Sequence, residues 1–218
     1  MSHNDSVTMP HPRSKVQSMT SQELSTAQNT MRNVSFAVVD FETTGLNPEI
    51  DRIVQLAAVI VNGEGLIVDS FDTIVKPESP AEYQHGAEHI HGISVEQVAS
   101  GMPLRKALEQ LWSINAGHIF TAHNAAFDLG FLHAESKRVG LEGHVDIHVD
   151  TLELARRTTG ADTTRKHNLF ALCEHYGIER DKVHDAKSDA TATAQLLMHL
   201  IKELGVETPD QVAELFVP

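Results

Sequence analysis

The sequence predicts an α/β domain in which a mixed, five-stranded sheet is flanked by helices on both faces. Three apolar runs joined by short turns come first, which indicates an antiparallel meander. Helical patterns that alternate with shorter apolar runs follow. Strands first and then alternating helix and strand are typical of a mixed sheet covered on both sides.

The composition indicates one sizeable globular domain, because 218 residues with 41% apolar content suffice for a single core. The net charge of −13, from 17 basic and 30 acidic residues, argues against a protein that coats nucleic acid by bulk charge. It leaves room for an enzyme that binds one strand end through metal ions and a few local cations.

The single cysteine, Cys173, cannot form an intrachain disulfide and suits a reducing compartment. The longest apolar run, Ile53–Val61, is too short to span a bilayer, and residues 1–33 lack the apolar core of a signal peptide. We therefore expect a cytoplasmic protein without a membrane partner.

Strands are expected over Val34–Glu42, Ile53–Val61 and Leu66–Val75, the last two joined by the turn signal of residues 62–65. The near-continuous apolar character of the first strand favours a central position in the sheet. Residues 1–33 are rich in Ser, Thr, Asn, Gln and Met, and are expected to form a disordered or weakly helical tail.

Helix start signals and apolar periodicity define the remaining elements. Helices are expected over Ser94–Val98, from Pro103, from Asn124 as N-cap to about Val139, and over Leu152–Thr158, Leu169–Tyr176 and about Ala186–Leu204. Strands are expected at His118–Ala122 and Asp146–Asp150. Residues 205–218 form a short extension, where Thr208, Pro209 and Gln211 predict a final short helix.

The first strand ends in Asp40 and Glu42, followed by a Thr-Thr-Gly turn. Side chains two residues apart on a strand point to the same face, so both carboxylates project together. Two such charges repel by about 4 kcal/mol at ~4 Å and an effective dielectric near 20. A divalent cation is the natural compensation, although a solvated edge would also explain this pair alone.

Two further stretches place polar side chains at the ends of elements. Asp128 lies in the first turn expected after Asn124, where a carboxylate can reach the sheet edge or simply complement the helix dipole. His184 and Asp189, five residues apart, converge only if His184 lies on the loop before the long helix, with Asp185 as N-cap.

A packed sheet gathers such ends along one edge, where four carboxylates would hold two divalent cations about 4 Å apart. A pair of ions there would bind a phosphodiester, generate hydroxide and stabilise the leaving oxygen. Histidine, with an unperturbed pKa near ~6.5, is suited to take a proton from water.

At these residues the sequence resembles the DEDDh 3′–5′ exonucleases of the ribonuclease H-like superfamily, and is most similar to the proofreading epsilon subunit of bacterial DNA polymerase III. The three family motifs are Asp-x-Glu-Thr-Thr-Gly at Asp40–Gly45, His-Asn-x-x-Phe-Asp at His123–Asp128, and the pair His184 and Asp189. The resemblance covers about residues 34–204, which we take as the exonuclease domain. His184 argues against the sister subfamily, which carries a Tyr in the last motif.

The resemblance implies that Asp40 bridges two Mg²⁺ or Mn²⁺ ions, that Glu42 and Asp189 serve the ion that holds the attacking water, and that Asp128 supports the second ion. It implies His184 as general base. A substrate pocket is implied by the backbone amides of Thr43 and Thr44, by Leu46 as a wedge, and by the following lining residues: His91, Asn124 and Phe127.

The expected substrate is a single-stranded or frayed nucleic-acid 3′ end, favouring DNA and hence proofreading or DNA repair. Two alternatives remain open: an RNA-directed 3′–5′ exoribonuclease, and a non-catalytic, polymerase-associated module that binds strand ends. A DNA polymerase subunit or a sliding clamp is a further expected partner. Gln211–Phe216 faintly resembles a clamp-binding peptide, but its spacing is imperfect and the capped helix is the preferred interpretation of this stretch.

Overall fold

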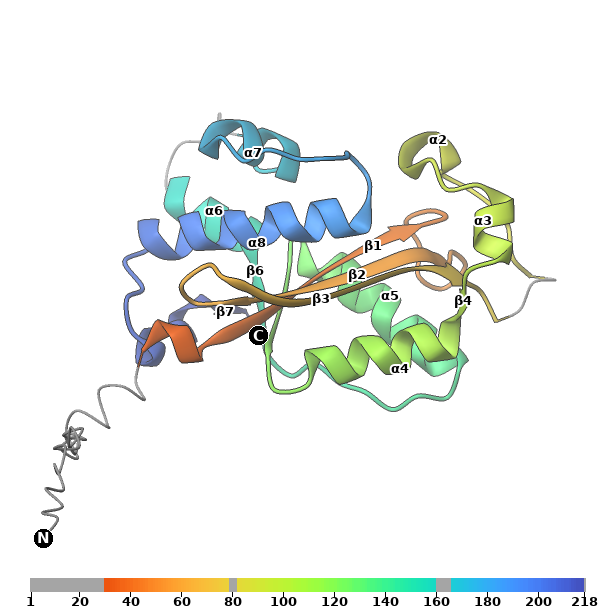
Figure 1. Cartoon of the computed structure of the whole chain (residues 1–218), viewed down its shortest axis with the longest axis horizontal. Coiled ribbons are helices and arrows are strands. Elements are labelled where there is room, and N and C mark those ends of the chain that lie inside the picture. The colour runs from red at the N-terminus through yellow and green to blue at the C-terminus, as the bar shows by residue number, and fades with distance from the viewer. Residues whose placement is uncertain (1–29, 79–81, 160–165, 218) are drawn as a thin grey trace, which may run out of the picture.

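The computed structural model describes residues 30–78, 82–159 and 166–217, so most of the expected tail lies outside the described residues. Its centre is a mixed sheet with helices on both faces, as the sequence predicts (Figure 1). The 3₁₀ turn η1 (Met31–Asn33) precedes the expected start at Val34, and the Gly63 amide donates a hydrogen bond to the Met31 carbonyl. Among the described helices, none is long and apolar enough to cross a bilayer.

The sheet has seven strands in the order β4-β3-β2-β1-β5-β6-β7. Their bounds are β1 Ser35–Thr43, β2 Ile53–Asn62, β3 Ile67–Lys76, β4 Met102–Pro103, β5 Ile119–Ala122, β6 His148–Asp150 and β7 Phe216–Val217. Strand β1 is central, antiparallel to β2 and parallel to β5. The five expected strands are present, and β4 and β7 add two edge strands of two residues each, too short to produce a periodic pattern.

The helices follow the expected order, with the short α2 added before α3. Their bounds are α2 Glu88–His91, α3 Val95–Ala99, α4 Leu104–Asn115, α5 Ala125–Arg138, α6 Thr151–Thr159, α7 Leu169–Tyr176 and α8 Ala186–Glu203. The expected C-terminal helix is the 3₁₀ helix η2 (Pro209–Leu215), which leads into β7. Because β7 pairs with β6, the C-terminal extension completes one edge of the sheet.

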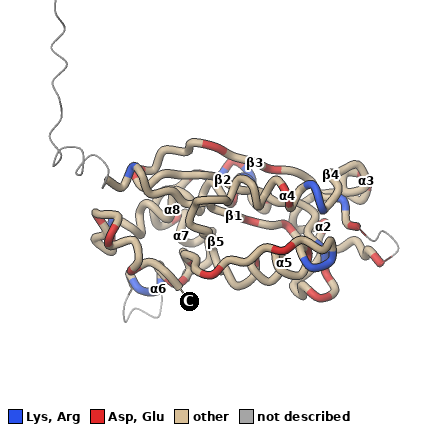
Figure 2. Tube along the Cα trace, turned by 90° about the horizontal axis from the view of Figure 1, so that it is seen from below, with Lys and Arg blue, Asp and Glu red and all other residues tan. Residues whose placement is uncertain are grey.

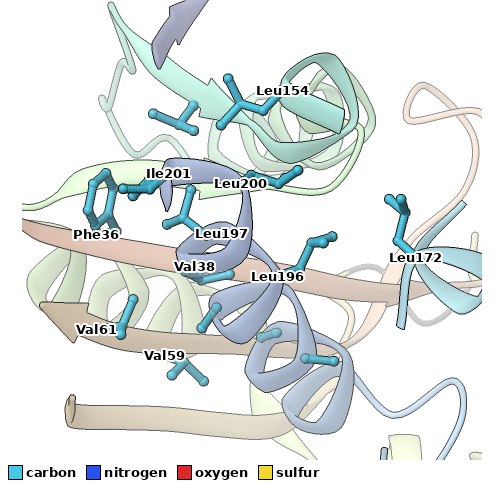
Figure 3. Close-up of a cluster of buried hydrophobic side chains, with 14 of the residues drawn as sticks. Phe36, Val38, Val59, Val61, Leu154, Leu172, Leu196, Leu197, Leu200 and Ile201 are labelled. Atoms are coloured by element: carbon cyan, nitrogen blue, oxygen red, sulfur yellow. The ribbon is translucent and has the colours of Figure 1, made fainter. Parts of the chain in front are cut away.

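Helix α8 covers one face of the central strands (Figure 3). Leu197 and Leu200 of α8 pack in one buried cluster with Phe36 and Val38 of β1. Four alanines of α8 are also buried there, which allows its backbone to approach the sheet: Ala186, Ala190, Ala192 and Ala194. The opposite face carries Val39 and Phe41, in a second cluster with side chains of α4 and α5.

The alternation of side chains between the two faces of β1 determines where its carboxylates lie. Phe36 and Val38 belong to the cluster under α8, so Asp40 and Glu42 continue that face toward the end of the strand. The side of the sheet that binds α8 along its length therefore ends in two acids. The prediction that the acids share one face is confirmed by this register.

We expect Leu200→Ala to lower the free energy of unfolding by about 2–5 kcal/mol, because the Leu200 side chain of α8 is fully buried against the sheet and truncation leaves a cavity. Leu66→Ala, at a side chain that is 59% exposed, should change it by less than about 0.5 kcal/mol. Urea denaturation of both variants measures the difference. Equal losses in the two variants would contradict the burial of Leu200 in the core.

Candidate active site

Four carboxylates and one histidine gather where β1, α5 and α8 meet. Asp40 and Glu42 come from the end of β1, Asp128 from the first turn of α5, and Asp189 from the first turn of α8. Glu42, Asp128 and Asp189 are buried, whereas Asp40 is half-buried. The five residues expected to carry catalysis are thus brought to one end of the sheet.

Asp128 is positioned by the start of α5, where Asn124 occupies the expected N-cap position. Asn124 adopts a left-handed conformation with φ of 70° and makes no side-chain cap. Asp150 at the end of β6 takes that role, since its carboxylate accepts hydrogen bonds from the amides of Asn124 (3.0 Å) and Ala125 (3.1 Å). Asp150 lies 25 residues after Ala125, so the sequence around the start of α5 does not reveal this contact.

Asp189 and His184 are positioned by the start of α8, as the sequence predicts. Asp185 is the N-cap and accepts a hydrogen bond from the Ser188 amide (3.2 Å). Exposed His184 precedes it with φ of 56°, a strained conformation for a non-glycine residue. This left-handed turn brings a ring nitrogen of His184 within 4.8 Å of carboxylate oxygens of both Glu42 and Asp189.

Gln55 of β2 fixes α8 to the sheet beside these acids. It lies opposite Glu42 in the β1–β2 register. Its side-chain amide donates to Asp185 (3.3 Å), and its carbonyl oxygen accepts from the Ala186 amide (3.2 Å). In the sequence Gln55 is visible only as the polar interruption of an apolar run, and its role was not predicted.

Burial and mutual repulsion raise the pKa values of the clustered carboxyl groups. Burial, followed by the charges of Asp128, Asp189 and Glu42, raises the pKa of Asp40 well above its usual range. Burial and the charges of Asp189 and Asp185 raise the pKa of Glu42 to about 7. Burial also raises the pKa of Asp128, against hydrogen bonds from its own amide and that of Phe41. Such a site favours cations.

Arg180, in the loop between α7 and α8, lies among these acids and was not singled out from the sequence. Its guanidinium forms an ion pair with Asp189, in which Nε lies 3.1 Å from Oδ1 and Nη2 contacts the same oxygen. Burial raises the pKa of Asp189, and the Arg180 contacts oppose that rise. Nothing in the local pattern of the loop distinguishes Arg180 from a solvated cation.

The residues present fit a hard divalent cation. Glu42, His184 and Asp189 each offer one ligand atom, and these atoms lie within 4.8 Å of one another. Carboxylate oxygens are the ligands that Mg²⁺ and Mn²⁺ prefer. Burial and mutual repulsion raise the carboxyl pKa values of Asp40 and Glu42 despite the nearby charge of Arg180, so the cluster favours additional positive charge.

Thr43 and Thr44 shape the turn after β1. The Thr43 hydroxyl donates to the Gly45 carbonyl (2.6 Å), and the Thr44 amide donates to the Arg52 carbonyl (2.9 Å). The Thr44 amide is therefore engaged within the protein, unlike the nucleotide contact that the family resemblance implies for it. Both threonines are buried.

The other expected pocket residues divide into exposed and buried groups. Leu46 is 84% exposed and Asn124 is exposed, whereas Phe127 is half-buried against Phe131 with ring centroids 4.9 Å apart. His91 is 2% exposed, and both ring nitrogens are hydrogen-bonded, to the Gly86 carbonyl (3.1 Å) and the Ile93 amide (3.0 Å). His91 thus stabilises the α2 segment, and the structure leaves it no free ring nitrogen.

The charged residues are spread along the chain. In the view of Figure 2, Lys and Arg positions are scattered among acidic ones and form no continuous basic stripe. This arrangement agrees with the acidic net charge of −13 and with local, site-directed binding in place of bulk electrostatic coating.

Comparison with known proteins identifies the family. The RNase_T model, described as "Exonuclease", matches residues 37–197. The chain is 31% identical over 191 residues to the DNA polymerase III PolC-type protein of Thermotoga petrophila, covering 86% of the chain and 14% of that protein. It is 37% identical over 170 residues to the PolC-type protein of Oceanobacillus iheyensis, covering 78% and 12%. The chain therefore spans a small part of these curated relatives.

Solved structures share the fold. The nuclease domain of 3′hExo, a DEDDh family member bound to rAMP, has a TM-score of 0.67 and 18% identity, covering 78% of this chain and 92% of that one. Exonuclease I of E. coli in complex with a dT13 oligonucleotide has a TM-score of 0.68 and 20% identity, covering 79% and 42%. The family match over residues 37–197 shows that the chain belongs to the RNase_T family of exonucleases, and it shares the fold of the DEDDh nuclease 3′hExo.

Proposed function

We propose that this protein is a metal-dependent 3′–5′ exonuclease that releases 5′-mononucleotides from DNA ends. The observation that carries the proposal is the convergence of four carboxylates and His184 at one end of the sheet, in a chain whose family consists of exonucleases. Hydrolysis of a phosphodiester needs a proton acceptor for water and positive charge beside the phosphate. His184 is suited to accept the proton, and the carboxylates are suited to hold metal ions that would bring the positive charge.

Asp40, Glu42, Asp128 and Asp189 would hold two Mg²⁺ or Mn²⁺ ions. Such ions would polarise the phosphodiester, lower the pKa of water and stabilise the leaving oxygen. The protein's own contribution is to fix the four carboxylates on three elements of one rigid fold. The packing of β1 against α8 holds the carboxylates together against their mutual repulsion.

His184 is proposed as the general base. It is exposed, so substrate and water reach it, and its left-handed backbone turns the ring toward Glu42 and Asp189. Imidazole accepts a proton near neutral pH, which suits removal of a proton from the attacking water. Because His184 is exposed, it would then release that proton to solvent.

The 3′-terminal nucleotide is proposed to lie over the turn after β1. Exposed Leu46 would wedge beside the last base, with Asn124 and Phe127 lining the other side. Thr43 and Thr44 shape this turn. His91 is hydrogen-bonded to the Gly86 carbonyl and so supports the neighbouring segment before α2. Gly86 packs directly against the Thr44 carbonyl, and a Cβ at this position would clash with that oxygen.

DNA is the favoured substrate because the curated relatives that share 31–37% identity are named as DNA polymerase III proteins. A polymerase or sliding clamp is the corresponding proposed partner. The RNA-directed alternative is favoured by a different observation: the neighbour 3′hExo is bound to rAMP. Discrimination depends on the 2′-hydroxyl contact in the pocket, so both sugars belong in the same assay.

Asp40→Asn should reduce exonuclease activity by roughly 10²- to 10⁴-fold, because it removes one carboxylate from the cluster without changing the shape of β1. The assay uses 5′-labelled single-stranded DNA and RNA of one sequence, with Mn²⁺ or with EDTA. Wild-type protein should give a ladder that shortens from the 3′ end in Mn²⁺ only.

The matched control is Asp69→Asn, at an exposed position of β3, which should retain wild-type activity. Full activity of Asp40→Asn would contradict the catalytic assignment. A protein that binds strand ends and degrades neither strand under any metal would favour the non-catalytic module.

In EDTA, the free energy of unfolding should fall as pH rises from about 4.5 to about 7. Over this window folded Glu42 keeps its proton, whereas Glu42 of the unfolded chain has lost it. The free energy of unfolding therefore falls by up to about 1.4 kcal/mol per pH unit for this one proton. Glu42→Gln should flatten the slope, and Mn²⁺ should do the same in wild-type protein. Denaturation curves at several pH values measure it; identical slopes for wild type and Glu42→Gln in EDTA would refute this origin.

A further inference from the structure

Arg180 has an unusual position for an arginine beside a candidate metal site. Its side chain is only 8% exposed and pairs with Asp189, whose side chain is 9% exposed. Nε and Nη2 both contact Oδ1 of Asp189 and bond no other acid among the described residues. A buried guanidinium thus occupies one oxygen of a carboxylate that the family motif assigns to a metal ion.

We propose that Arg180 is a built-in cation of the active site, which neutralises the carboxylate cluster when no divalent ion is bound and competes with divalent ions for it. The inference rests on the proposed function, because it assumes that the cluster binds metal. The inference goes beyond that function because it assigns a positively charged side chain of the protein itself to balance the acids when no metal ion is bound.

The influence of Arg180 extends beyond its partner. Its partner Asp189 has a carboxylate oxygen within 4.8 Å of one of Glu42, so the guanidinium lies close to both acids. Lys182 is a neighbouring cation, but its side chain is 63% exposed and lies 3.8 Å from Asp185. Among the described cations near the cluster, Arg180 combines burial with direct contact to one of the four acids.

Competition follows from charge and from occupancy. Arginine keeps its charge across the physiological pH range, so it cannot become neutral when an ion arrives. A divalent ion at Asp189 either displaces the guanidinium from Oδ1 or binds the other oxygen close to a fixed positive charge. Both routes weaken ion binding relative to a site without Arg180.

The contact also fixes the loop that carries the proposed base. Arg180 and His184 lie on the same connection between α7 and α8, and the Arg180–Asp189 pair ties that connection to the first turn of α8. The metal-free protein therefore keeps Asp189 and the His184 loop in place without an ion. Without this ion pair, repulsion among the acids would act more strongly on this end of the fold.

The test compares Arg180→Met, Arg180→Lys and Lys182→Gln with wild-type protein. Melting temperatures are measured in EDTA, and Mn²⁺ affinity is measured by calorimetry, so neither readout needs nuclease activity. Arg180→Met should melt lower in EDTA, gain more stability from Mn²⁺, and bind Mn²⁺ about tenfold more tightly. Arg180→Lys keeps the charge and should stay near wild type in both. Lys182→Gln removes an exposed charge and should change little.

Weaker Mn²⁺ binding by Arg180→Met would overturn the proposal, because Arg180 would then be orienting a ligand and not competing. An unchanged melting temperature of Arg180→Met in EDTA would overturn the neutralising role. If Arg180→Met folds only with Mn²⁺, the proposal is supported, since the ion replaces the lost charge. Wild-type protein that binds no Mn²⁺ would refute the metal-dependent function and the competition, while the EDTA comparison still decides the neutralising role.

Discussion

The structure depends on one unfavourable interaction: four carboxylates held together at the end of a sheet. Two unit charges about 4 Å apart repel by about 4 kcal/mol at an effective dielectric near 20, a large fraction of the stability of a domain. Burial and the neighbouring acids raise the pKa of Glu42 to about 7, so protonation relieves part of this repulsion, and the buried guanidinium of Arg180 offsets another part. A cluster that is costly without cations is a cluster prepared to bind them.

Packing far from the acids keeps them in place. Strand β1 is fixed between β2 and β5, and α8 lies on it through buried alanines and leucines. Gln55 then fixes the N-terminus of α8 opposite Glu42, and Asp150 fixes the start of α5 that carries Asp128. The acids thus come from three elements whose positions are set by a continuous core and by two polar side chains.

The sequence predicted what depends on neighbouring residues and missed what depends on distant ones. Alternation along β1 placed Asp40 and Glu42 on one face, and the Asp185 cap set the turn that presents His184. The N-cap position of α5 was correctly assigned to Asn124, yet its side chain makes no capping bond, and Asp150 accepts the hydrogen bonds of the first amides from a strand far along the chain. The pairing of Arg180 with Asp189 and the edge strands β4 and β7 likewise arise only from tertiary contacts.

The most direct test of the central claim is anomalous diffraction from crystals of the protein soaked in Mn²⁺ with a nucleoside 5′-monophosphate. The account predicts two anomalous peaks among the side chains of Asp40, Glu42, Asp128 and Asp189, with the phosphate beside them and the base near Leu46. Empty density at these four carboxylates, at Mn²⁺ concentrations that support nuclease activity, would contradict the claim that the cluster is the metal centre.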